Sequence, residues 1–176
     1  GESGVGKSTF ALNLLGITHE AQVNVSTPSQ EIELDATLKD AWFSAIGWIP
    51  QLPQLAAGTL RYQFQLISST IQDSDIEKVL ARCGLELDQL VDGLDTQLGA
   101  YGEGSNAVSG GQLRKIAIAR ALISKPQLLI ADEPTADLDS DSADKVMKTL
   151  RGYATSGAIV ICITHDLSIL RKDDSQ

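Results

Sequence analysis

The second half of the chain alternates short apolar runs with longer amphipathic stretches. Residues 128–131 and 158–163 are continuous apolar runs of strand length, which is typical of strands covered on both faces of a parallel sheet. Apolar residues at helical spacing precede the first run and separate it from the second: Leu113, Ile116, Ala117 and Ala121, then Ala143, Val146, Met147 and Leu150. This order predicts an α/β fold with right-handed crossovers and a doubly wound, mostly parallel sheet flanked by helices.

The first half of the chain adds a glycine-rich loop that runs into a helix, over residues 1–15. Two further strands are predicted at residues 31–34 and 45–49. We expect a loop that bears Trp42 and Phe43 between them.

The middle of the chain predicts a small helical subdomain, over about residues 59–124. Ser74 or Asp75 is suited to cap the start of one of its helices, and Gly84 is suited to end that helix. Residues 96–108 are rich in Gly, Ser and Asn and have no periodicity, which predicts a loop.

The composition fits one globular domain and excludes several classes of protein. The 176 residues carry 14 Lys and Arg against 23 Asp and Glu, and this net charge of −9 is the wrong balance for binding nucleic acid. No apolar run approaches the roughly 20 residues that cross a bilayer. Cys83 and Cys162 have no CxxC spacing, so we expect structural thiols in a reducing cytosol. Because there is no initiator Met and the first residue belongs to a motif, we expect a single domain, residues 1–176, truncated at both ends.

A phosphate-binding motif opens the chain. Residues 1–8 satisfy G-x-x-x-x-G-K-[ST] ahead of a helical pattern. Such a loop points successive backbone N–H groups at an anion, and the helix N-terminus adds about half a positive charge. Lys7 would reach the β and γ phosphates, and Ser8 would hold Mg²⁺. The predicted ATP-binding residues are Gly1, Glu2, Ser3, Gly4, Val5, Gly6, Lys7, Ser8 and Thr9.

Two acids, Asp132 and Glu133, end the apolar run at residues 128–131. They would lie at the sheet edge where ligands of α/β folds bind. Because adjacent side chains diverge, Asp132 can hold Mg²⁺ through water while Glu133 takes a proton from an attacking water. The alternative is that both acids are simply solvated at the end of a strand. The phosphate-binding motif in the same chain disfavours this alternative.

Residues 108–112, Val-Ser-Gly-Gly-Gln, resemble the LSGGQ signature of ABC ATPases, with Val108 in place of Leu. Ser109 would cap a helix, and the amides that follow would form a second anion site. In ABC ATPases the signature of one subunit closes on the nucleotide held by the phosphate loop of another. The resemblance therefore implies a head-to-tail homodimer or heterodimer with a second ABC ATPase domain, whose ATP would be contacted by Ser109, Gly110, Gly111 and Gln112.

Three further positions match this family. Gln51 resembles the Q-loop glutamine, which senses Mg²⁺ and the attacking water, and Asp137 resembles the D-loop aspartate, which crosses the dimer interface. His165 resembles the switch histidine, which contacts the γ-phosphate. The resemblance implies a P-loop NTPase fold of the ABC type and ATP hydrolysis by the catalytic residues Glu133, His165, Gln51 and Lys7, with Mg²⁺ on Ser8, Gln51 and Asp132.

Further resemblances favour an exporter. Residues 58–60 and the Gly-Glu-Gly at residues 102–104 are similar to exporter sequences, although a short insertion that includes Tyr101 departs from the pattern around Glu103. Residues 42–54 most resemble the CydDC type, a heterodimer that exports cysteine and glutathione for cytochrome bd assembly. The resemblance implies a transmembrane transport domain as partner and a place on the cytoplasmic face of the inner membrane.

Three alternatives remain open from the sequence. One is an ABC ATPase with a regulatory or mechanical role and no transport, and a second is an exporter of lipid, peptide or drug. The third is a P-loop kinase of small molecules, which gives no reason for Ser109 to Gln112 or for His165.

Overall fold

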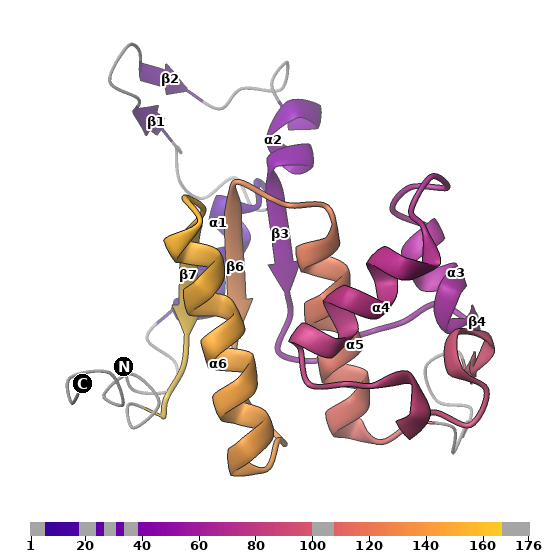
Figure 1. The fold of residues 1–176 in the computed structure, drawn as a ribbon. Coiled ribbons are helices and arrows are strands. Elements are labelled where there is room, and N and C mark those ends of the chain that lie inside the picture. The colour runs from indigo at the N-terminus through magenta and orange to yellow at the C-terminus, as the bar shows by residue number, and fades with distance from the viewer. Residues whose placement is uncertain (1–5, 18–23, 27–30, 34–38, 100–107, 167–176) are drawn as a thin grey trace.

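The computed structural model describes residues 6–17, 24–26, 31–33, 39–99 and 108–166. Its centre is a three-stranded parallel sheet in the order β3-β6-β7 (Figure 1). Strand β3 spans Ile46–Ile49, β6 spans Leu128–Asp132 and β7 spans Ile159–Ile163. The two apolar runs of the second half are therefore neighbouring parallel strands, and the predicted α/β fold is confirmed.

Helices cover both faces of the central strand β6, because successive side chains of a strand point to opposite faces. Leu128 and Ile130 pack in one apolar cluster with α1 (Lys7–Leu14) and with Trp42 of α2 (Lys39–Ala45). Leu129 and Ala131 pack in another with α5 (Gly110–Ile123) and α6 (Ser140–Thr155). Figure 1 shows α6 in front of the sheet and α1 behind it, as the prediction of a doubly wound sheet requires.

A lobe of short helices lies beside α5, away from the sheet (Figure 1). It contains α3 (Leu60–Gln65), α4 (Asp73–Arg82) and two 3₁₀ turns, η1 (Leu87–Gln89) and η2 (Gly93–Asp95). Phe64 and Leu80 are fully buried in it, and they belong to the same apolar cluster as Ile118 of α5 and Leu129 of the sheet. The lobe and the sheet thus share one continuous core.

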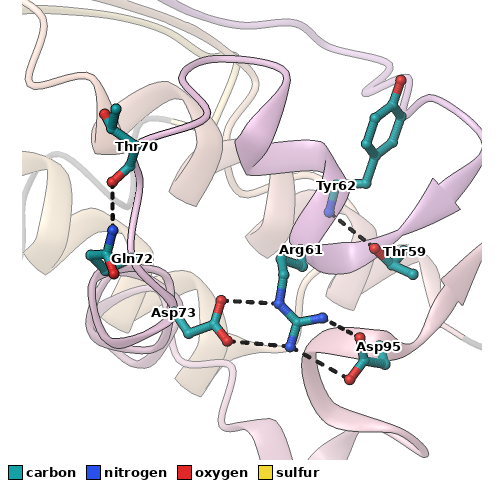
Figure 2. Close-up of polar contacts among 7 residues, drawn as sticks. All are labelled: Thr59, Arg61, Tyr62, Thr70, Gln72, Asp73 and Asp95. Carbon is teal, nitrogen blue, oxygen red and sulfur yellow. Dashed lines mark hydrogen bonds and ion pairs between the residues drawn. The ribbon is translucent and has the colours of Figure 1, made fainter.

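Hydrogen bonds and ion pairs of Arg61 connect three elements of the lobe, α3, α4 and η2 (Figure 2). From α3, its guanidinium donates to both carboxylate oxygens of Asp73 at the start of α4, at 3.0 and 3.2 Å, and also pairs with Asp95 of η2. These bonds raise the pKa of Arg61 above its usual range. At the start of α3 the Thr59 hydroxyl accepts a hydrogen bond from the Tyr62 amide at 3.1 Å, which caps the helix.

Among the described residues, two short antiparallel pairs of strands accompany the sheet. One joins β1 (Asn24–Ser26) to β2 (Glu31–Glu33), and the other joins β4 (Gly58–Thr59) to β5 (Gln97–Leu98). The β2 strand was predicted from the sequence, whereas β5 falls where the sequence predicts a loop. No helix in the described ranges has both the length and the apolar character needed to span a bilayer.

Three local predictions are wrong. Trp42 and Phe43 lie in α2 and not in a loop, because the Trp42 indole donates to the Leu14 carbonyl at 2.8 Å and anchors α2 on the end of α1. Helix α4 begins one residue before Ser74, with Gln72 as its N-cap and no side-chain cap. Strand β7 is not covered along its whole length: Ile159 is 65% exposed, and β6 is the partner of β7 among the described strands.

Both cysteines are free thiols. Cys83 is fully buried at the end of α4, and Cys162 is partly buried in β7. Burial raises the pKa of Cys83 to about 12 and that of Cys162 to about 11. Both side chains are therefore protonated and unreactive near neutral pH, consistent with the predicted structural role.

Candidate active site

The predicted phosphate loop enters α1 through Gly6. This residue has φ +88°, in the left-handed region that favours glycine, and its carbonyl accepts the first helical bond from the Phe10 amide at 2.8 Å. As a glycine it brings no side-chain oxygen to the N–H groups at the start of α1, so those groups and Lys7 form the positive end expected of an anion site. Residues 1–5 and the side chain of Ser8 lie outside the described parts of the chain.

Asp132 and Glu133 lie at the carboxyl end of the central strand β6. Both are nearly buried, with 4% and 8% of their surface exposed. Glu133 leaves the strand with φ +48°, a left-handed conformation that is uncommon for a residue other than glycine. Its amide donates to the Ile163 carbonyl at 2.8 Å, which ties it to the end of the neighbouring strand β7.

The Glu133 carboxylate meets His165, which follows β7. Glu133 Oε1 lies 2.8 Å from His165 Nδ1 and accepts a hydrogen bond from the His165 amide at 3.0 Å. The Glu133 side chain is 11% exposed, whereas that of His165 is 76% exposed. The fold thus brings together two residues that the sequence separates by 32 positions, because the strands they follow are parallel neighbours.

Arg114 is a site residue that the sequence analysis missed. It lies in the second turn of α5, it is 3% exposed, and its guanidinium donates to two backbone carbonyls, that of Glu133 at 3.0 Å and that of Gln51 at 2.8 Å. The same nitrogen that bonds Gln51 lies 3.7 Å from Asp137 Oδ2. A signal was available in the sequence, since Arg114 shares a helix face with the apolar residues Ile118 and Ala121 at spacings of four and seven.

The predicted signature residues form the start of α5. Ser109 is the N-cap and makes a capping box: its hydroxyl accepts from the Gln112 amide at 3.2 Å, and the Gln112 side chain accepts from the Ser109 amide at 2.8 Å. Ser109 and Gly110 are exposed. Because a hydroxyl can accept one hydrogen bond and donate another, Ser109 can cap α5 and still donate to an anion from a second molecule.

The remaining predicted site residues have distinct settings. Gln51 is exposed and lies two residues after Ile49, the last residue of β3, and the side chain of Asp137 is 80% exposed. Asp137 also has a left-handed backbone, with φ +61°. The structure therefore links Gln51, Glu133 and Asp137 through Arg114, and it places the signature on a helix that covers the opposite face of the sheet from α1. Glu103, in the segment that resembles exporter sequences, lies outside the described residues.

The donor set at the end of β6 fits Mg²⁺. This ion prefers oxygen ligands and is held in nucleotide sites by one or two carboxylates together with phosphate oxygens and water. Asp132 offers a nearly buried carboxylate, and Gln51 offers an exposed amide oxygen. The described residues contain no group of three or more His, Cys, Asp or Glu side chains that could hold a metal by themselves.

Comparison with known proteins identifies the family. The family model described as ABC transporter matches residues 1–136. The chain belongs to this family, and its fold is that of the family's ATP-binding domains, which are ATPases.

Individual relatives are larger proteins. The chain is 39% identical over 180 residues to the ABC-type transmembrane transporter verA of Clonostachys rogersoniana, covering 98% of this chain and 14% of that protein. It is 33% identical over 178 residues to the glutathione/L-cysteine transport system ATP-binding/permease protein CydD of Haemophilus influenzae, covering 99% of this chain and 28% of that protein. A solved structure, a bacterial Atm1-family ABC exporter with ATP bound, superposes with a TM-score of 0.82 at 26% identity, over 97% of this chain and 29% of that one. The chain thus spans less than a third of each.

Proposed function

We propose that this chain is the ATP-hydrolysing domain of an ABC exporter. Residues 1–9 hold the triphosphate, and Glu133 is the general base that takes a proton from the attacking water. His165 and Gln51 complete the surroundings of the γ-phosphate. Mg²⁺, held by Ser8, Asp132 and Gln51, would neutralise the charge that develops on the phosphate oxygens.

The observation that carries this proposal is the contact between Glu133 and His165. A nearly buried carboxylate at the end of the central strand lies 2.8 Å from an imidazole on the neighbouring strand end. The edge formed by the carboxyl ends of parallel strands is where α/β folds bind ligands. A carboxylate base in hydrogen-bond contact with an imidazole at that edge supports water activation next to a terminal phosphate.

The same proposal includes a second nucleotide-binding domain. The exposed start of α5 is a helix N-terminus that is separate from the phosphate loop, and it covers the opposite face of the sheet from α1. We infer that Ser109 and Gly110 contact ATP held by a partner domain, as the resemblance of residues 108–112 to the ABC signature implies. Closure of the two domains around ATP would drive an attached transmembrane domain at the cytoplasmic face of the inner membrane.

The finer proposal concerns the cargo. The similarity to CydD favours export of thiols such as cysteine and glutathione, with a non-identical partner chain. The similarity to verA is of the same order, so exporters of other cargo are the competing candidates. Uptake of radiolabelled glutathione and cysteine into inverted vesicles that contain the transporter tests the choice: ATP-dependent uptake of neither thiol contradicts the finer proposal alone.

The general base is tested by Glu133→Gln. Removing the base slows hydrolysis by roughly 10²-fold to 10⁴-fold on typical magnitudes for general-base catalysis, while ATP binding persists. The matched control is Glu77→Gln, which changes an exposed glutamate of α4 in the same way and leaves turnover unchanged. Turnover in Glu133→Gln equal to that of the control removes Glu133 from this role.

The head-to-tail dimer is tested by cross-linking Ser109→Cys in one domain to Gly4→Cys in the other. We expect a disulfide that forms with ATP and not without it. Cys83 and Cys162 are poor competitors for this disulfide, because burial raises their pKa values to about 12 and about 11. A P-loop kinase gives no cross-link in either condition.

A further inference from the structure

Arg114 connects segments that the proposed function assigns to two different ATP molecules. Its own helix, α5, begins at Ser109, for which we proposed a contact with the partner's ATP. Its guanidinium bonds the carbonyls of Gln51 and Glu133, which act on the ATP bound by the same chain. A guanidinium is planar and has two terminal nitrogens that can each donate a hydrogen bond. It can therefore hold two separate carbonyls in fixed relative positions.

The backbone that Arg114 holds is conformationally demanding. Glu133, whose carbonyl accepts a bond from Arg114, has φ +48°, and residues other than glycine persist in this region where their surroundings hold them there. The Glu133 carbonyl accepts from Arg114 at 3.0 Å and from the Ala136 amide at 3.1 Å. Removal of the guanidinium therefore takes away one of the two bonds that orient this peptide, and takes from the Gln51 carbonyl the 2.8 Å bond made by Arg114.

Stability alone gives little reason for an arginine here. Burial lowers the pKa of Arg114, because the charged guanidinium loses its hydration, and the exposed carboxylate of Asp137 offsets only part of that cost. An unbranched apolar side chain of similar length would fill the same space without it. The hydrogen bonds from Arg114 to the two loops are what such a side chain would lack.

We propose that Arg114 is a positioning residue that couples the two ATP sites of the dimer. When ATP of the partner draws in the start of α5, the guanidinium moves the Gln51 and Glu133 peptides with it, so each site becomes competent when the other is filled. This inference rests on the proposed function, and it adds a residue and a cooperative linkage to it.

The test uses the intact transporter that carries this domain and the variants Arg114→Met, Arg114→Lys and Lys115→Met. Met removes the donors at similar length, and Lys keeps the charge without the fork. Lys115→Met is the matched control, since it removes a cation from the adjacent position of the same helix, where the ammonium donates to the Gly84 carbonyl at 3.1 Å. Hydrolysis rates are measured against ATP concentration, and binding is measured with trinitrophenyl-ATP.

For Arg114→Met we expect kcat to fall by roughly 10-fold to 100-fold, the cost of a small misplacement of catalytic groups. Affinity for trinitrophenyl-ATP stays within about 3-fold, because Arg114 is not part of the phosphate loop. The Hill coefficient falls towards 1, Arg114→Lys lies between Met and wild type, and Lys115→Met behaves as wild type.

Two results overturn the inference. One is a Hill coefficient that is the same in Arg114→Met and wild type, including the case in which both equal 1. The other is a loss of kcat that is matched by an equal loss of folded protein in thermal denaturation. The proposed function fails separately, if the wild-type transporter does not hydrolyse ATP or if Glu133→Gln leaves hydrolysis intact.

Discussion

Ser109 has two roles that a single substitution can separate. Its hydroxyl caps α5, and the proposed function adds a contact with ATP bound by the partner. Ser109→Ala removes the 3.2 Å bond from the Gln112 amide and keeps the 2.8 Å bond that the Ser109 amide donates to the Gln112 side chain. Loss of one N-cap bond costs about 1 kcal/mol, which corresponds to a decrease in Tm of about 2–4 °C for a domain of this size.

The matched control is Thr59→Ala. Thr59 caps α3 by the same kind of bond, at 3.1 Å from the Tyr62 amide, and it has no proposed contact with ATP. We expect the same loss of about 1 kcal/mol of stability from this variant. The pair therefore separates the cost of a lost cap from the cost of a lost ligand contact.

The two variants should differ in ATP hydrolysis. A hydrogen bond to a charged phosphate oxygen is worth about 1.5–3 kcal/mol, so Ser109→Ala should lower kcat/KM by roughly 10-fold to 100-fold. Thr59→Ala should stay within about 2-fold of wild type. Steady-state hydrolysis by the intact transporter and thermal denaturation of the same samples give both quantities. Equal loss of kcat/KM in the two variants would refute the reasoning and leave Ser109 as a helix cap.

Three further changes test the fold. Gly47→Ala should destabilise the sheet by about 1–3 kcal/mol or more, measured by urea denaturation, because its Cβ would lie 2.7 Å from Pro126 Cγ; full stability would contradict the packing of β3. Arg61→Gln should lower Tm by a few degrees at low ionic strength, and the difference from wild type should shrink in about 1 M salt, because the ion pairs are largely exposed; a salt-independent difference argues against the pairing. Burial raises the pKa of Cys83 to about 12 from its ordinary 9.0, so unfolding releases a proton above about pH 9 and the free energy of unfolding falls by up to about 1.4 kcal/mol per pH unit. Cys83→Ala should lessen this dependence of the free energy of unfolding on alkaline pH. An unchanged dependence would refute the attribution to Cys83.

Much of the fold was predictable because its signals are local. The continuous apolar runs became β6 and β7, and Ser109 capped α5 through the Gln112 three residues later, as the capping-box pattern predicts. Features that depend on distant contacts were missed. Helix α2 is held by a bond from Trp42 to the Leu14 carbonyl, 28 positions away, and this bond leaves no mark on the residues around Trp42.

The candidate site divides in the same way. Separate sequence motifs identified Glu133 and His165 as candidates. The parallel register of β6 and β7 brings Glu133 Oε1 to 2.8 Å from His165 Nδ1. Arg114 has no motif of its own, since its acceptors are backbone carbonyls that any residue type supplies. An arginine within the apolar stripe of a helix was the one local sign that a polar network lies beneath it.

The continuous apolar core has a mechanical consequence. Because Phe64 of the lobe and Leu129 of the sheet belong to one buried cluster, neither part can melt without exposing the other, and calorimetry of the domain should record a single endotherm. A movement of the lobe that exposed this shared cluster to water would cost much of the domain's free energy of unfolding. If the proposed function holds, movement around bound ATP would therefore tilt the lobe and the sheet together as one stiff body, without a hinge between them.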